Sequence, residues 1–491
     1  MSNPDKKKQI AVIKRNFLVV LSGDIGRRLL NFLIKITLSR ISIQLFGQIS
    51  FALNLITYPL WISNAGLSTI GTKRIARDNE AFKNIVVRVT SLRFLISLVA
   101  TSLFATTVLL TSIDAAKKIL IILFSLSVPI SMLQIDWAFN GLQKMHISSI
   151  GLFLFRLLYL FFILSFYKKI NNTIYVPFFY IISLFCVTLY FLALFLKTIQ
   201  SPDYNGGKDH RADKQSILKE WREFLRESIP IGLANILTQL YFHIDMTMIG
   251  FMKNDIDVGL YSAAFGLAFV FIGLRDIVVR VVYPYEVKLI AGGDTNELSR
   301  FISTFTRLGI MIGIPLGFGG FLLGDKYITL IYTANYLEAA FTFKLLTIAV
   351  GITFINIILP SLFYASDLHK HYMKITMFTA LFNIILNGVL IPILGIEGAA
   401  IATVITHLLS LTFFYLFAKK LLKIRLNILN TLIKVVISCV VMLSVIILSR
   451  RVLDIENVFY LTAFGFSSYG ICIVLFKTIP KELIKFIKNK A

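Results

Sequence analysis

The chain has 491 residues, of which 57% are hydrophobic and 13% aromatic, and its mean hydropathy of +0.78 excludes a soluble globular protein. Apolar runs long enough to cross the hydrocarbon layer recur along the chain without the alternation of an outer-membrane barrel, so we expect an all-α polytopic membrane protein. The formal net charge of +24 favours basic cytoplasmic loops over nucleic-acid binding.

About fourteen membrane spans are predicted, with twelve as the lower bound. They cover residues 17–38, 45–69, 90–111, 118–140, 148–167, 174–197, 226–251, 258–283, 301–324, 339–366, 371–392, 397–418, 428–449 and 458–476. If the N-terminus is cytoplasmic, the inner segments carry 31 Lys and Arg residues and the outer segments carry nine. Because positively charged loops stay on the cytoplasmic side, this bias predicts a cytoplasmic (inner) membrane protein with both termini in the cytoplasm.

Charged residues interrupt the first predicted span. Its polar residues are Asp24, Arg27, Arg28, Asn31 and Lys35. At mid-membrane an Arg that faces lipid is disfavoured by roughly 2.5–3.5 kcal/mol. The polar residues recur at helical spacing opposite Leu29 and Leu33, which predicts a polar stripe that lines a water-filled cavity. An internal Asp24–Arg28 ion pair inside the bundle is the alternative that this spacing leaves open.

The longest loop divides the chain into halves. Its segment 216–227 predicts an amphipathic helix on the inner surface with Trp221 and Phe224 towards lipid. The stretch "FGQISFALNL" after the first span matches "VGLYSAAFGL" after the seventh, so we expect two similarly oriented lobes. The predicted parts are an N-terminal lobe at 1–197, a cytoplasmic linker at 198–225, a C-terminal lobe at 226–418, and two additional helices with a basic tail at 419–491.

Other ionisable residues fall inside later spans. The candidates for cavity or ion-coupling roles are Arg156, His243, Asp245, Arg275, Arg280 and Arg307. For each Arg alone the alternative is snorkelling or ion pairing, and for His243 with Asp245 it is capping of the outer end of their helix. Together they are mainly cationic, which favours an anionic ligand because Arg binds phosphate through its planar fork. No metal-ligand spacing is present and no cofactor is expected; H+ or Na+ coupling remains open.

The stretch "FNIILNGVLIPILGIEGAAIATVITH" predicts a tight helical hairpin. Pro392 ends one helix, Gly395 and Gly398 form the turn, and Ala399 and Ala400 let two helices pack closely. This stretch resembles a hallmark of the multidrug/oligosaccharidyl-lipid/polysaccharide exporter superfamily. The stretches "FHIDMTMIG" and "NAGLSTIGTKRIARDNE" are similar to its polysaccharide, or O-antigen, repeat-unit flippase branch.

The resemblance implies two six-helix lobes around a central cavity, two C-terminal helices, and alternating access. It implies a flippase that moves a polyprenyl-pyrophosphate-linked oligosaccharide to the outer leaflet for O-antigen, lipopolysaccharide or capsule. Arg27, Arg28 and Lys35 would hold the pyrophosphate. The implied partners are this lipid-linked oligosaccharide, membrane lipids, and the polysaccharide polymerase and chain-length machinery.

Three alternatives remain open. A peptidoglycan lipid-precursor flippase and a drug/cation antiporter share the fold, although the few embedded acids count against the antiporter. A membrane glycosyltransferase or polymerase belongs to a different class. The sequence has no Walker A motif, no Asp-x-Asp and no Gly-x-Ser-x-Gly, so we do not expect an enzyme.

Overall fold

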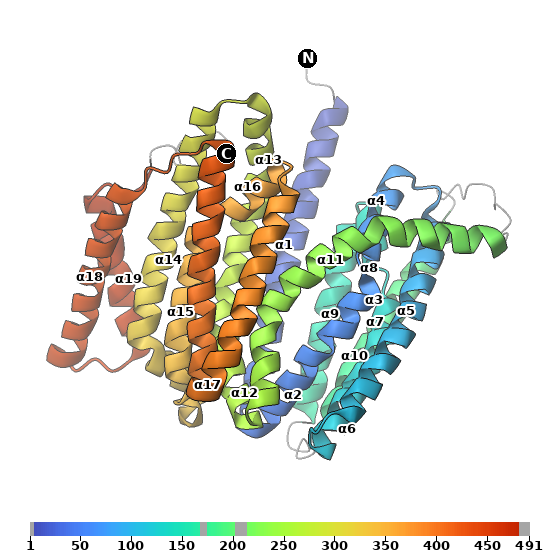
Figure 1. Ribbon diagram of the computed structural model, residues 1–491, viewed down its shortest axis with the longest axis horizontal. Coiled ribbons are helices and arrows are strands. Elements are labelled where there is room, and N and C mark those ends of the chain that lie inside the picture. The colour runs from blue at the N-terminus through green and yellow to red at the C-terminus, as the bar shows by residue number, and fades with distance from the viewer. Residues whose placement is uncertain (1–3, 167–173, 202–213, 481–491) are drawn as a thin grey trace. The chain divides into compact units, whose positions relative to one another are not determined.

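The computed structural model describes residues 4–166, 174–201 and 214–480, and every regular element within these ranges is a helix. The chain forms two compact units, Met1–His243 (unit 1) and Ile244–Ala491 (unit 2). The division falls inside one helix, α11 (Lys214–Met252). It therefore lies beyond the linker at 198–225, and the predicted four-part scheme stays a prediction. Figure 1 labels the helices.

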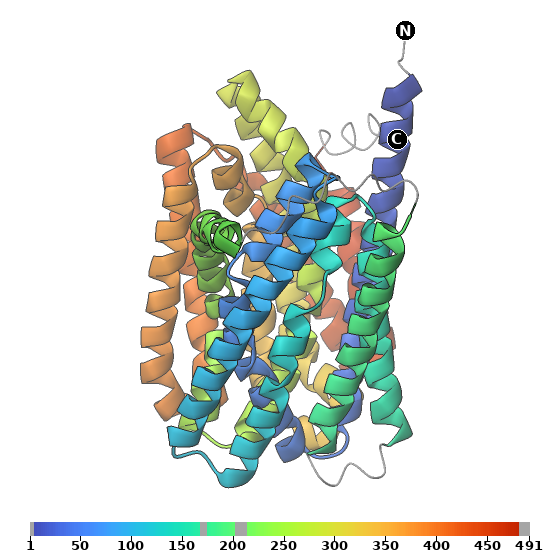
Figure 2. The same ribbon diagram turned by 90° about the vertical axis from the view of Figure 1, so that its right-hand side faces the viewer.

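Unit 1 is built around a core of aromatic side chains. Its helices are α1 (Pro4–Ser39), α2 (Ile43–Leu55), α3 (Thr57–Asn64), α4 (Leu67–Arg77), α5 (Phe82–Leu110), α6 (Ala115–Ser125), α7 (Ser127–Met132), α8 (Asp136–Gly141), α9 (Met145–Ser165), α10 (Tyr175–Ile199) and the first part of α11. The long ones appear in blue to green in Figure 2. Phe139 lies between Phe82 and Phe191, with ring centroids 6.2 and 6.3 Å away. This core joins α5, α8 and α10.

Part of the amphipathic segment packs on protein, so the prediction that Trp221 and Phe224 face lipid is wrong. Phe224 is 1% exposed within the core of unit 1, beneath the Arg74 guanidinium at 4.0 Å from its ring centroid. Trp221 packs against the same core. Glu227 accepts a hydrogen bond from Arg74 at 2.7 Å, and Glu220 pairs with Arg88. A surface helix buries its apolar face on whichever apolar surface is available. The turn-rich residues 202–213 lie outside the described residues.

Unit 2 begins within α11. Its other elements are α12 (Asp255–Ala268), η2 (Phe269–Phe271), α13 (Ile272–Gly292), α14 (Thr295–Tyr332), η3 (Ala334–Tyr336), α15 (Ala339–Ile355), α16 (Leu359–Ala365), α17 (His369–Leu422), α18 (Leu429–Val452) and α19 (Val458–Leu475). A Cβ atom on Gly309 or Gly313 of α14 would clash with the α15 backbone. These glycines therefore let two membrane helices approach to backbone contact.

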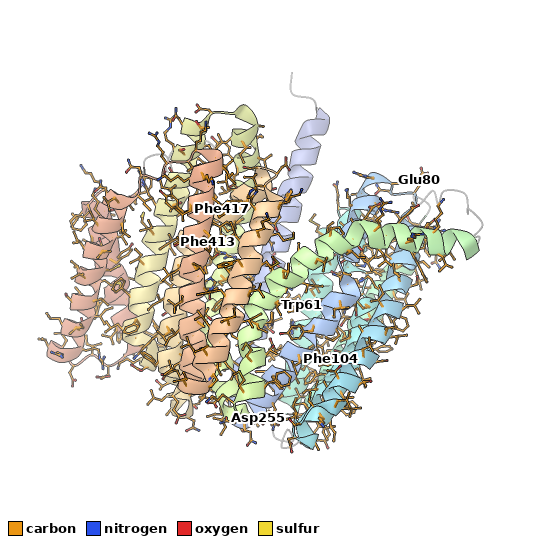
Figure 3. The ribbon with its side chains drawn as sticks, in the orientation of Figure 1. Trp61, Glu80, Phe104, Asp255, Phe413 and Phe417 are labelled. Atoms are coloured by element: carbon orange, nitrogen blue, oxygen red, sulfur yellow. The ribbon has the colours of Figure 1, made fainter. Side chains whose placement is uncertain are left out.

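Helix α17 is a hairpin, as predicted. Asn383 Nδ2 lies 3.4 Å from Thr406 Oγ1, although 23 residues of straight helix would span about 34 Å. The rings of Phe378 and Phe413 have centroids 5.3 Å apart, and Figure 3 labels Phe413. The turn is at Gly395 (φ 60°, ψ −135°), three residues beyond the predicted helix end at Pro392. Proline has a helical φ, so the helix continues until glycine reverses it.

The predicted fold class and span count are confirmed. Ten helical segments of the described chain are long and apolar enough to cross a membrane. The second half of α17, the long helices α1 and α11, and the α12–α13 pair account for the other four. The α18–α19 pair belongs to unit 2, since Cys439 is buried with Ile310 of α14 and the Tyr469 hydroxyl donates to the Met311 carbonyl at 2.7 Å.

Candidate functional site

The charged part of α1 lies against α9. A Cβ atom on Gly23 would lie 2.9 Å from Ser149 Cβ, and one on Gly26 would lie 3.0 Å from the Phe153 ring. The contacts advance in step along both helices, so α1 and α9 run in the same direction. At 1.5 Å per residue, Arg156 falls at a level between Arg28 and Lys35. The two helices therefore bring the predicted residues of the first span and Arg156 together.

We call Arg27, Arg28, Lys35 and Arg156 the basic group of unit 1. Arg156 lies close enough to Arg27 and Lys35 for the like charges to repel one another. Arg27 donates to Asp24 Oδ1 at 3.1 Å, three residues apart on the same helix. The Arg27 and Asp24 side chains remain 37% and 25% exposed, so this ion pair is not sealed inside the bundle.

The opposite side of α1 is apolar and exposed. Leu29 is 58% exposed and Leu33 is 47% exposed, as expected for side chains that face lipid. Asp24, Asn31 and Lys35 are half-buried on the other side. The apolar and the polar side chains of α1 thus lie on opposite sides of the helix, as their spacing predicts. Their role in binding pyrophosphate stays a prediction.

His243 also belongs to unit 1. Its Nδ1 lies 2.6 Å from Asn54 Oδ1, and Asn54 Nδ2 donates to the His243 carbonyl at 3.1 Å. The imidazole meets the ring of Trp61, labelled in Figure 3, edge to face with centroids 5.1 Å apart. The positive charge of Lys35 is close enough to oppose a positive charge on this imidazole. His243 therefore extends the basic group with hydrogen-bonding and aromatic surface.

Asp245, two residues further along α11, is the centre of a polar network in unit 2. It is 4% exposed. Its Oδ1 accepts from Asn387 Nδ2 at 2.6 Å, and its Oδ2 accepts from the hydroxyls of Thr403 (2.6 Å) and Tyr261 (2.8 Å). Asn387 also donates to Asn383 Oδ1 at 3.0 Å. None of the described residues forms an ion pair with Asp245, so its donors are all neutral amides and hydroxyls.

Three other predicted residues lie in unit 2, and the local partners of two of them are clear. Arg275 Nη2 pairs with the neighbouring Asp276 at 2.9 Å. Arg307 Nε donates to the Asn427 carbonyl at 2.8 Å and ties α14 to the α17–α18 connection. Arg280 is exposed. The structure therefore gives Arg307 a structural contact, and it assigns no anion-binding geometry to the three.

The sequence analysis predicts no functional role for the partners of Asp245. Asn383, Asn387 and Thr403 lie inside the stretch that predicts the hairpin, and Tyr261 lies inside the repeated stretch "VGLYSAAFGL". Asn383 and Asn387 are four residues apart in an apolar span, so they share one helix face. That spacing is the signal that identifies them as a polar pair needing buried partners.

A match to the family described as "Polysaccharide biosynthesis protein" covers residues 13–290, more than half of the chain. The chain belongs to this family. The predicted superfamily membership is thereby confirmed, and the chain is a multi-pass membrane protein.

Curated relatives match part of the chain. The probable low-salt glycan biosynthesis flippase Agl15 of Haloferax volcanii is 21% identical over 39% of this chain and 41% of its own length. The probable flippase AglR of the same organism is 25% identical over 36% and 38%. The probable lipid II flippase MurJ of Rickettsia prowazekii is 23% identical over 40% of each chain. The chain thus spans about two fifths of the length of these relatives.

Two solved structures show the same fold. A lipid II flippase MurJ in an inward closed conformation is 17% identical with a TM-score of 0.60, covering 96% of this chain and 99% of its own. An inward-facing multidrug resistance MATE family transporter is 14% identical with a TM-score of 0.60, covering 83% and 98%. The curated relatives are flippases by name, in line with the expectation that the chain is not an enzyme.

Proposed function

We propose that this protein is a flippase that moves a polyprenyl-diphosphate-linked oligosaccharide from the inner to the outer leaflet of the cytoplasmic membrane by alternating access. The product would serve O-antigen, capsule or a similar surface polysaccharide, and both termini would be cytoplasmic. Polymerase and chain-length proteins would be downstream partners. The basic group of unit 1 is the observation that carries this proposal.

The charge of the basic group suits a diphosphate. Four cations and Asp24 give a net charge of +3 on one side of α1 and α9, against a dianionic diphosphate diester. Guanidinium groups bind phosphate oxygens through two parallel N–H donors. Asn54 and Trp61 beside His243 add the hydrogen-bonding and aromatic surface that sugars need. Binding of an anionic ligand would also explain why a membrane-spanning helix carries these cations.

The test is transport in proteoliposomes with a lectin-accessible polyprenyl-diphosphate oligosaccharide. We expect R27A, R28A and K35A each to lower the rate about tenfold to hundredfold, because each loses a charge-assisted hydrogen bond. R27K should retain part of the rate, since it keeps the charge without the fork. Arg40, exposed at the end of α1, supplies the matched control R40A. Equal losses in R40A and R27A would contradict the proposal.

A peptidoglycan lipid-precursor flippase is the second candidate. The MurJ likeness covers 96% of this chain, including α18 and α19, whereas the MATE likeness covers 83%. Both candidate substrates carry a polyprenyl diphosphate, so the basic group serves either one. Rescue of a strain that lacks its essential cell-wall flippase would favour this candidate. Rescue of surface polysaccharide alone would favour the first.

We further propose that Asp245 couples transport to an ion, H+ or Na+. A carboxylate buried among neutral donors has its negative charge uncompensated by any described cation, which favours a proton or a monovalent cation beside it. Transport driven separately by a Na+ gradient and by a pH gradient tests this. D245N should abolish the dependence on whichever gradient drives the native protein. Unchanged dependence in D245N would contradict ion coupling at Asp245 and leave substrate binding untouched.

A further inference from the structure

A second acid of unit 2, Glu286, occupies an apolar stripe of α13. Val282, Glu286 and Leu289 follow one another at helical spacing, and all three are buried. Glu286 itself is 0% exposed. Helix α13 packs on α14, α15, α16 and η2. The carboxyl group therefore lies in the packed interior of unit 2.

Neither carboxyl oxygen of Glu286 has a hydrogen-bond partner among the described residues. The Ser361 hydroxyl on α16 is the polar side chain that acts on it, but this hydroxyl donates to the Ile358 carbonyl at 2.9 Å. A hydroxyl has a single hydrogen, so while Ser361 donates to Ile358 it cannot also donate to Glu286.

No charged group in the described part of the chain compensates Glu286 either. The titratable side chains on the surrounding elements are Arg275, Asp276, Arg280, Tyr283, Tyr285 and Lys288 on α13, Glu297, Arg300 and Arg307 on the first half of α14, Lys344 on α15 and Tyr364 on α16, and η2 has none. None of these exerts a charge effect on the Glu286 carboxyl. Its surroundings are apolar apart from Ser361.

Burial without donors disfavours the ionised form. A carboxylate removed from water without a cation or hydrogen-bond donors is opposed by several kcal/mol, and such a group stays neutral by keeping its proton. Asp245 differs, because three donors converge on its oxygens. The conformation of α13 and α16 in this structure is therefore one in which Glu286 holds a proton.

We propose that Glu286 is a proton-binding site whose occupancy holds α13 against α16, and that release of the proton requires the two helices to separate. Pro284, two residues before Glu286, lies inside α13. Proline removes a hydrogen bond of the helix, so α13 has a built-in point at which it can bend. The site involves neither Asp245 nor the basic group of unit 1, so it stands independently of the proposed function.

The sign of the pH dependence follows from this linkage. The bound proton stabilises the α13–α16 contact, so the contact is complete at low pH and is lost as pH rises. One proton changes the ratio of separated to packed forms about tenfold per pH unit. Glutamate titrates at about 4.3 in model peptides and far higher when buried, so the range from about pH 5 to about pH 9 covers the transition.

Thiol labelling reports the contact directly. In a protein whose three native cysteines, Cys186, Cys439 and Cys472, are replaced by Ala, S361C places a thiol on the buried face of α16. Its rate of reaction with a small maleimide is divided by that of N296C, an exposed position, which removes the intrinsic pH dependence of thiols. With Glu286 present we expect the corrected rate to rise about tenfold per pH unit.

The isosteric variant E286Q is the decisive comparison. A neutral amide cannot release a proton, so the corrected S361C rate should stay low and flat with pH. The variant E286D should keep a pH-dependent rate, and the infrared band of a protonated carboxylic acid at neutral pH should be present in the native protein and absent from E286Q. The same slope in E286Q, or no slope in the native background, would overturn the proposal. No substrate is required, so this outcome is distinct from failure of the flippase assignment.

Discussion

The charged side chains of the membrane helices differ between the two units. In unit 1 the basic group remains partly exposed, and Arg27 has a single ion-pair partner on its own helix. In unit 2 the acids Asp245 and Glu286 are buried, and Asp245 receives donors from α12 and from both halves of α17. A large anionic ligand needs donors that it can reach, whereas a proton or a small cation can bind in a packed interior. The difference therefore suggests a division of labour between ligand and ion.

Reversing a charge in the basic group should have the largest effect. We expect R156E to lower transport more than about hundredfold, because the group loses two units of charge and a charge-assisted hydrogen bond. R40E makes the same change outside the group and should stay within about twofold of the native rate. Transport assays in proteoliposomes measure both. A normal rate in R156E would remove Arg156 from the site.

Removing one hydroxyl from the Asp245 network should cost less. T403V leaves the charge of Asp245 but deletes a donor at 2.6 Å, so we expect a loss of about tenfold to hundredfold in ion-driven transport. Thr412, whose hydroxyl donates to the Leu408 carbonyl, gives the matched variant T412V on the same helix. If T403V and T412V behave alike, the network around Asp245 has no role in coupling.

A substitution that changes shape without changing charge tests the packing of unit 1 alone. Gly66 has φ +80°, and a Cβ atom there would lie 2.7 Å from the Ser228 carbonyl oxygen and 2.9 Å from the Gly232 nitrogen. G66A should lower the free energy of unfolding of unit 1 by about 1–3 kcal/mol. Gly470 has open space, so G470A should be neutral or slightly stabilising. Thermal unfolding in detergent checks both, and an unchanged midpoint in G66A would contradict the close contact.

The smallest effect is expected from Asp24. D24N raises the net charge of the basic group by one, so affinity for a polyprenyl diphosphate in nanodiscs should increase about two- to fivefold. The gain should shrink as salt is added, because Arg27 and Asp24 are partly exposed. D114N makes the same charge change at the start of α6 and should leave the affinity as it is. Weaker binding in D24N would show that Asp24 positions Arg27.

Much of the fold follows from local pattern. Apolar length predicts the spans, and Gly395 with its neighbouring alanines predicts the α17 hairpin because few other sequences allow that turn. The segment 216–227 was misassigned because its apolar face does not specify what covers it. Asp24 can pair with Arg27 or Arg28, since spacings of three and four both place side chains on one face.

The buried acids could not be read from the sequence in the same way. Two partners of Asp245, Asn387 and Thr403, lie 142 and 158 residues away in α17, so no local spacing links them to Asp245. In the sequence, Glu286 follows the predicted span 258–283, where an acid at a helix end near the inner surface is expected to be exposed. Its burial depends on α14 and α16, whose positions are set by packing of the whole unit.

The α18–α19 pair contacts α14 through an ion pair and hydrogen bonds at several positions along the helix. Lys326 pairs with Glu456, Tyr327 hydroxyl lies 2.7 Å from Thr462 Oγ1, and Tyr469 reaches the Met311 carbonyl. Truncation before α18 would leave these polar groups facing acyl chains and would uncover the apolar side of α14. We therefore expect a chain shortened before α18 to be degraded by quality-control proteases rather than to form a smaller active transporter.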